Sequence, residues 1–101
     1  MKNPGWHDFI HLCRHAKTDE EYSDMFDLLF TPEEKSDVAL RCLILKELLS
    51  GKKTQREIAK DLKVSIAKIT RGSNELKRIP DKTKTFFLKQ LLSAKHDVKR
   101  K

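Results

Sequence analysis

Glycine, proline and cysteine are scarce in this sequence. Its 101 residues include three glycines, three prolines and two cysteines, and long runs of β-branched residues are absent. A chain with few turn formers, in which apolar residues recur every three or four positions, is typical of helices joined by short loops. We therefore predict an all-α fold of six helices in a single domain, residues 1–101.

Sequence features of membrane, secreted and enzymatic proteins are also missing. No segment approaches the roughly 20 apolar residues that span a bilayer, and the opening MKNPGWHDF lacks the apolar run of a signal peptide. The serines lie in no GxSxG motif, and neither a phosphate-binding glycine loop nor an HExxH motif occurs. We expect a cytoplasmic protein that is not an enzyme.

Cysteine and histidine give no metal-binding pattern. Cys13 and Cys42 each lie in an apolar helical pattern, so we expect both to be reduced core residues. His7, His11 and His15 repeat every four residues, a spacing that could place two metal ligands on one helix face. Because they lie outside the apolar stripe and lack carboxylates or thiolates in ligand geometry, we expect a solvated face and no metal.

Charge is divided unevenly along the chain, whose net charge is +7. Residues 1–50 carry 6 lysines and arginines against 10 acidic residues, a net −4, whereas residues 51–101 carry 16 against 5, a net +11. A basic region favours polyanions, because neutralising phosphates releases counterions. We therefore expect the second half to bind nucleic acid.

The first half has the pattern of three helices that a second subunit covers. We expect the first helix over about residues 6–16 and the second after an Asp19 cap. A long third helix starts after Thr31 and ends at Gly51. Apolar residues surround most of this helix, which only a buried helix tolerates. In so short a chain a partner subunit is the simplest cover, so we predict a homodimer interlocked through residues 1–50.

Residues 54–76 have the pattern of a helix-turn-helix. Thr54 and Glu57 stand at the spacing of a capping box, and Ser65 can cap a second helix. Small Ala59 allows the two helices to cross closely. Two further segments follow, a last helix over residues 80–94 that completes the core and a basic tail over residues 95–101.

Four parts of the sequence are distinctive together: LLFTPEE, Arg41, ELLSGKKTQREIAKDL and SIAKITRGSNELK, of which the ITRGSN stretch is the most distinctive. In their order and spacing they resemble the tryptophan repressor family. The likeness covers about residues 28–77, while the first and last helices fit the family by position and pattern only. It implies an interlocked all-helical dimer that binds L-tryptophan as co-repressor and represses genes for tryptophan synthesis or uptake at palindromic operators.

The resemblance also implies a site for L-tryptophan. Arg41 and Arg71 would sandwich the indole between two guanidinium planes, and Arg71 would also bind the carboxylate. Gly72 would let the ring approach the backbone, and Glu75 stands where the best-known member offers a serine to the amino group. Backbone carbonyls contributed by the partner subunit would accept the ammonium group, near Leu28, Phe30 and Thr31.

The DNA-binding residues implied by the resemblance lie in and just after the helix-turn-helix. Arg56 is the best candidate for a direct guanine contact, and a filled ligand site would fix the second helix at the angle that fits DNA. Lys63 stands in the turn where glycine commonly relieves a positive φ angle, and Lys68 replaces the usual threonine. The residues expected at the DNA are Gln55, Arg56, Ser65, Ile66, Ala67, Lys68, Thr70 and Lys77.

Two other functions fit parts of the pattern. A constitutive DNA-binding protein of the related replication-initiator type would share the helix-turn-helix but would have no use for Arg41 paired with Arg71. A helical adaptor whose basic half binds an acidic protein would need no specific DNA sequence. Arg41 has an alternative of its own, an ordinary ion pair with Asp37 one helical turn earlier.

Overall fold

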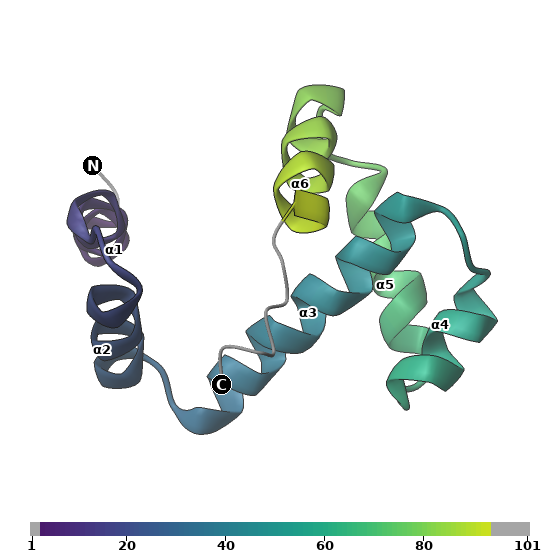
Figure 1. Cartoon of the computed structure of the whole chain (residues 1–101), viewed down its shortest axis with the longest axis horizontal. Coiled ribbons are helices and arrows are strands. Elements are labelled where there is room, and N and C mark those ends of the chain that lie inside the picture. The colour runs from purple at the N-terminus through teal and green to yellow at the C-terminus, as the bar shows by residue number, and fades with distance from the viewer. Residues whose placement is uncertain (1–2, 94–101) are drawn as a thin grey trace. The chain divides into compact units, whose positions relative to one another are not determined.

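The computed structural model describes residues 3–93, and these residues form six α-helices and no strand (Figure 1). The predicted all-α fold is therefore confirmed for this range. The predicted tail, residues 95–101, lies outside the described residues. The helices are α1 (Pro4–His15), α2 (Asp19–Leu29), α3 (Pro32–Ser50), α4 (Gln55–Leu62), α5 (Ile66–Leu76) and α6 (Asp81–Ser93).

Two compact units make up the chain, and the boundary between them falls inside α3, between Asp37 and Val38. Sequence reasoning placed the dimerisation helices in residues 1–50, so its boundary does not coincide with this one. That residues 1–101 act as a single domain stays a prediction.

The start of α2 differs from the sequence-based prediction. The hydroxyl of Thr18 accepts a hydrogen bond from the amide of Glu21 at 3.0 Å, and the Glu21 carboxylate accepts the amide of Thr18 at 3.3 Å. The prediction that Asp19 caps the helix is wrong, because Asp19 is its first residue. A reciprocal Thr-Glu pair satisfies two backbone amides, whereas a lone aspartate cap satisfies one.

Aromatic rings join α1 to α2 in the first unit. The ring centroid of Phe30 lies 5.9 Å from that of Phe9 and 5.5 Å from that of Phe26. The hydroxyl of Tyr22 on α2 donates a hydrogen bond of 2.9 Å to the carbonyl of Cys13 on α1. These contacts lie in the range favoured by aromatic pairs, so they fix the two helices as a hairpin.

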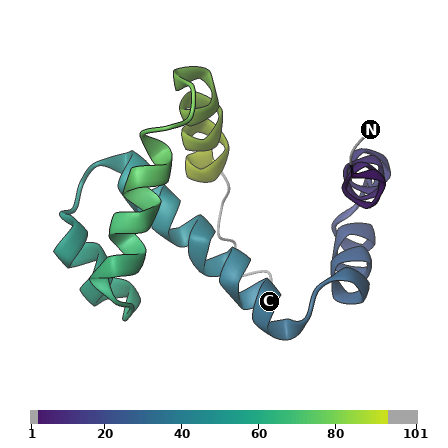
Figure 2. The same ribbon diagram turned by 180° about the vertical axis from the view of Figure 1, so that it is seen from behind.

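The second unit has a small core shared by three helices. Figures 1 and 2 show α5 crossing α3 in both views. Four residues from α3, α4 and α5 are buried, and Ile58 and Ile69 have no exposed surface. Half-buried apolar side chains surround these four. The buried residues are Ile44, Ile58, Ala59 and Ile69, and those packed around them are Leu40, Leu48, Leu62 and Val64.

The cysteines are free, and only one of them is partly buried. Cys13 is half-buried, whereas Cys42 is exposed. The prediction that Cys42 is a core residue is wrong for the isolated chain. Cys42 lies two positions before buried Ile44, and two residues along a helix turn the side chain to nearly the opposite face.

The turn between α4 and α5 is left-handed at Lys63, as the sequence predicts. Lys63 has φ 60° and ψ 45°, and it is the non-glycine residue with a positive φ among those described. The amide of Val64 then donates to the carbonyl of Ala59 at 3.0 Å, which turns the chain toward α5. A side chain in this region is strained, because its Cβ approaches the backbone.

We expect Lys63→Gly to stabilise the protein by about 0.5 to 1 kcal/mol, because glycine adopts this conformation without strain. The same change at Lys60, an exposed position inside α4, should destabilise it by about 1 kcal/mol. Urea unfolding at one fixed protein concentration measures both. Equal losses in the two variants would show that Lys63 carries no strain.

Candidate nucleic-acid interface and ligand site

Both helices of the helix-turn-helix begin at the predicted caps. The hydroxyl of Thr54 accepts the amide of Glu57 at 3.1 Å, and the Glu57 carboxylate accepts the amide of Thr54 at 2.8 Å. The hydroxyl of Ser65 accepts the amide of Lys68 at 3.4 Å. The capping pattern therefore sets where α4 and α5 start, and with them the positions of the residues expected at DNA.

The buried side of α5 faces the core and leaves the other side free. Ile69 is fully buried, and Ser73 and Leu76, which follow it at helical spacing, are half-buried. Ile66 fits the same apolar spacing, yet 46% of it is exposed at the start of the helix. Of the residues predicted to contact DNA, Gln55 is half-buried; the exposed ones are Arg56, Ser65, Ile66, Ala67, Lys68, Thr70 and Lys77.

A hydrogen bond that sequence reasoning missed links the two helices at this surface. The hydroxyl of Thr70 on α5 donates to the side-chain carbonyl of Gln55, the first residue of α4, at 2.9 Å. Both residues were assigned to DNA, but a contact across 15 positions has no sequence signal. The bond fixes the start of α4 against the middle of α5, so the two predicted DNA-contacting segments form one surface.

The two arginines predicted to hold the ligand both lie near the crossing of α3 and α5. A Cβ atom on Gly72 would lie 3.2 Å from Cγ2 of Ile44, which locates that crossing. Arg71 precedes Gly72 directly, and Arg41 lies one helical turn before Ile44. Both arginines are exposed. Neither makes an ion pair among the described residues, so the alternative pair of Arg41 with Asp37 does not form there.

The position of Gly72 has a packing reason. A side chain there would also meet Cδ1 of Leu48 at 3.4 Å, in addition to Ile44. Glycine therefore lets α5 lie close against α3, since a Cβ at 3.2 Å requires its neighbours to move. That Gly72 also makes room for an indole ring stays a prediction.

Glu75 already has a partner within the chain. Its Oε2 lies 3.2 Å from Nη1 of Arg78, and both side chains are exposed. Glu75 is the one carboxylate on α5 and lies one helical turn after Arg71. The helix thus carries a cation and an anion one turn apart, and these charges are opposite in sign to the carboxylate and the ammonium group of an amino acid.

The three residues expected to offer carbonyls lie at the junction of α2 and α3. Leu28 is in the last turn of α2 and Phe30 caps its end. Thr31 directly precedes α3, and its carbonyl accepts the amide of Lys35 at 3.0 Å. The last carbonyls of a helix have no partner within it, so this end of α2 is a place where an ammonium group can be bound.

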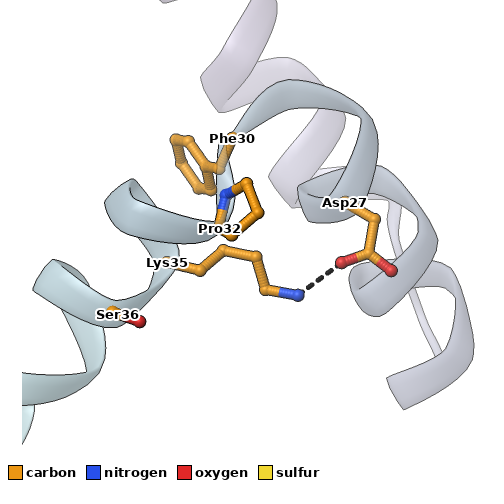
Figure 3. Close-up of a pocket in the computed structure, with 5 residues that line it drawn as sticks. All are labelled: Asp27, Phe30, Pro32, Lys35 and Ser36. Carbon is orange, nitrogen blue, oxygen red and sulfur yellow. Dashed lines mark hydrogen bonds and ion pairs between the residues drawn. The ribbon is translucent and has the colours of Figure 1, made fainter.

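An open hollow of about 410 Å³ lies at this junction (Figure 3). Phe30 and Pro32 line its apolar side, and the ammonium of Lys35 points toward the carboxylate of Asp27, with which it forms an ion pair. Ser36 completes the lining. Of the predicted ligand residues only Phe30 belongs to it, so the hollow is not the expected indole site.

Lys53, in the basic half, is held by two carboxylates. Nζ of Lys53 lies 2.7 Å from Oδ2 of Asp61 and 3.8 Å from Oε2 of Glu47. The hydrogen bond to Asp61 raises the pKa of Lys53 above its usual value. Desolvation opposes this rise, and the charges of Asp61, Glu47 and Glu57 add to it.

The described residues provide no metal site and no membrane span. His15 contacts the His11 carbonyl through Nδ1 at 2.9 Å, and the two rings lie 4.3 Å apart. In the part of the chain that the structure covers, no group of three or more histidine, cysteine or acidic residues could hold a metal ion. None of its helices is long and apolar enough to cross a membrane.

Comparison with known proteins extends the similarity over all six helices. A family model described as Trp repressor protein matches residues 4–92. A Trp operon repressor homolog of Chlamydia caviae is 52% identical over 83 residues, covering 82% of each chain. The homolog of Chlamydia trachomatis serovar D is 44% identical over 94 residues, 90% of this chain and 100% of the relative. That of Photobacterium profundum is 42% identical over 82 residues, 81% of this chain and 80% of the relative.

Proposed function

The chain belongs to the Trp repressor family, and on that premise we propose that it binds L-tryptophan and then represses genes for tryptophan synthesis or uptake at palindromic operators. The family is one of transcription regulators that use tryptophan as co-repressor, and the protein is not an enzyme. Its place of action would be the cytoplasm, where it meets both DNA and free tryptophan.

One observation carries the proposal: α5 bears both the predicted ligand residues and the predicted DNA residues. Arg71 and Glu75 share this helix with Lys68 and Thr70. A ligand held between Arg71 and Arg41 would contact α3 and α5 at once. It would favour one angle of α5, and a ligand shifts an equilibrium only through such a difference in affinity between two states.

The proposed dimer is supported by apolar side chains that the single chain leaves in solvent. Leu28 is 86% exposed, Phe86 60% and Trp6 58%. Burying such side chains is favourable by about 1.5 to 3 kcal/mol each. A two-fold dimer would also present two copies of α5 for successive major grooves about 34 Å apart, the geometry known for dimeric helix-turn-helix proteins, of which the tryptophan repressor is a standard example.

The ligand is tested by titrating L-tryptophan into the purified protein in a calorimeter. We expect saturation near one ligand per chain, and we expect Arg71→Leu to abolish it, because that change removes both the stacking plane and the partner of the carboxylate. Arg71→Lys keeps the charge without the plane and should bind weakly.

The mass of the Arg71→Leu dimer, measured by light scattering, should be unchanged. If wild-type protein folds and dimerises but binds no tryptophan, the result would contradict the co-repressor proposal and would support a DNA-binding protein that needs no ligand. A monomeric Arg71→Leu variant would contradict the separation of ligand binding from dimer formation.

Operator binding is tested on duplexes selected from a random library by the tryptophan-loaded protein. Arg56→Ala should weaken binding by about 1 to 3 kcal/mol and relax specificity at one base pair. Lys77→Ala is the matched control, because loss of a phosphate contact weakens all sequences alike and lowers the salt dependence. Failure to select any sequence would favour the adaptor, and a two-fold symmetric sequence would support the repressor.

The ion pair of Glu75 with Arg78 should compete with the ligand's ammonium group. Arg78→Ala should therefore raise the affinity for L-tryptophan about two- to fivefold, the scale of an exposed ion pair. Indole-3-propionate lacks the ammonium group, so its affinity should not change. Arg78→Lys, which keeps the charge, should resemble wild type. An equal gain for both ligands would show that Arg78 acts by crowding and not by its charge.

A further inference from the structure

Lys53, in the loop between α3 and α4, forms ion pairs with Asp61 and Glu47, and we call these three residues the Lys53 clamp. The ammonium of Lys53 lies within 2.7 Å of Asp61 and 3.8 Å of Glu47. Asp61 is in the last turn of α4, and Glu47 is in the last turn of α3. A single side chain from the connecting loop therefore joins the ends of both helices.

The two carboxylates occupy unfavourable places unless a cation accompanies them. The C-terminal end of a helix carries partial negative charge, which repels a carboxylate in the last turn. The last turn of α3 contains no basic residue that could offset Glu47. The Lys53 ammonium meets both carboxylates. Removing it would leave Glu47 in a helix turn with no basic residue and Asp61 in one whose basic residue is Lys60.

The clamp acts on the helix that carries Arg56. Helix α4 is only eight residues long, with Gln55 and Arg56 in its first turn and Asp61 in its last turn. Ile58 and Ala59 form its buried face. The buried face fixes α4 against the core, but apolar packing is non-directional. An ion pair at the far end of so short a helix restrains its rotation, and with it the direction of Arg56 and the bond from Thr70 to Gln55.

We propose that Lys53 is a positioning residue for DNA binding, which orients α4 through Asp61 and Glu47 and does not contact phosphate. The proposal rests on the proposed function, because its effect is measured as DNA affinity. The neighbouring lysine, Lys52, is exposed and makes no ion pair among the described residues, so it offers a matched control. The raised pKa of Lys53 agrees with a side chain committed to carboxylates.

A double-mutant cycle distinguishes a positioning role of Lys53 from a phosphate contact, because the two roles predict opposite changes in DNA affinity for Asp61→Asn. If Lys53 positions α4, Lys53→Met and Asp61→Asn both break the clamp, and each should weaken binding to the selected duplex about three- to tenfold, since a dimer carries the clamp twice. The double variant should lie within about twofold of the weaker single variant, because residues of one interaction are not additive. Asp61→Asn removes a negative charge, so simple electrostatics predicts the opposite change for it.

Salt dependence provides the second readout. Lys53→Met should leave the slope of log affinity against log salt unchanged, whereas loss of a phosphate contact lowers it by about one per subunit. Lys52→Met should lower this slope or leave it unchanged. Its effect on DNA affinity should be the same in the presence and in the absence of Asp61→Asn. Tighter or unchanged binding by Asp61→Asn, or a lower slope for Lys53→Met, would overturn the proposal and identify Lys53 as a phosphate contact.

Amide hydrogen exchange tests the clamp without DNA. Lys53→Met and Asp61→Asn should each speed exchange at Ile58 and Ala59 by a similar factor, and Lys52→Met should not. Unchanged exchange in α4 would overturn the positioning role even if DNA binding falls. If wild-type protein selects no duplex, the proposed function fails, while faster exchange confined to the two clamp variants would still establish that Lys53 orients α4.

Discussion

The close crossing of α5 on α3 at Gly72 is the contact on which the rest of the arrangement depends. With no side chain at this position, the backbone of α5 lies so close to α3 that a Cβ would touch Leu48 at 3.4 Å and would require Ile44, at 3.2 Å, to shift. Ile69 is buried by the same approach. Because protein interiors are close-packed, the absence of a side chain at Gly72 is what allows α5 to pack this closely on α3.

That crossing gives a physical reason for placing a ligand switch on this helix. Arg71 is adjacent to Gly72, and Thr70 is the residue before Arg71. A molecule inserted beside the crossing therefore acts within one turn of a residue predicted to face DNA. The bond from Thr70 to Gln55 would extend the effect to the start of α4. A ligand and DNA bound as proposed would therefore act on the same pair of helices, and no long path between the two sites would be needed.

Local features of the fold could be predicted from the sequence, and contacts between distant residues could not. Caps and turns depend on residues three to five apart, so Thr54, Ser65 and Lys63 were assigned correctly. The cap at Thr18 was missed because Asp19 beside it is also a good cap. Burial of Cys42 depends on what covers α3, and the Thr70 to Gln55 bond depends on the crossing angle. Neither quantity is encoded in local spacing.

The net charge of a sequence segment likewise does not show which of its lysines can bind phosphate. A net +11 in residues 51–101 predicts a polyanion partner, but a sum treats every lysine alike. Phosphate binding requires an ammonium group that is free to release counterions. Lys53 is held by two carboxylates and Lys52 is not, although they are neighbours of the same type. The useful quantity for a DNA-binding surface is therefore the number of cations left after internal pairing, and it depends on where carboxylates such as Asp61, Glu75 and Asp81 lie in space.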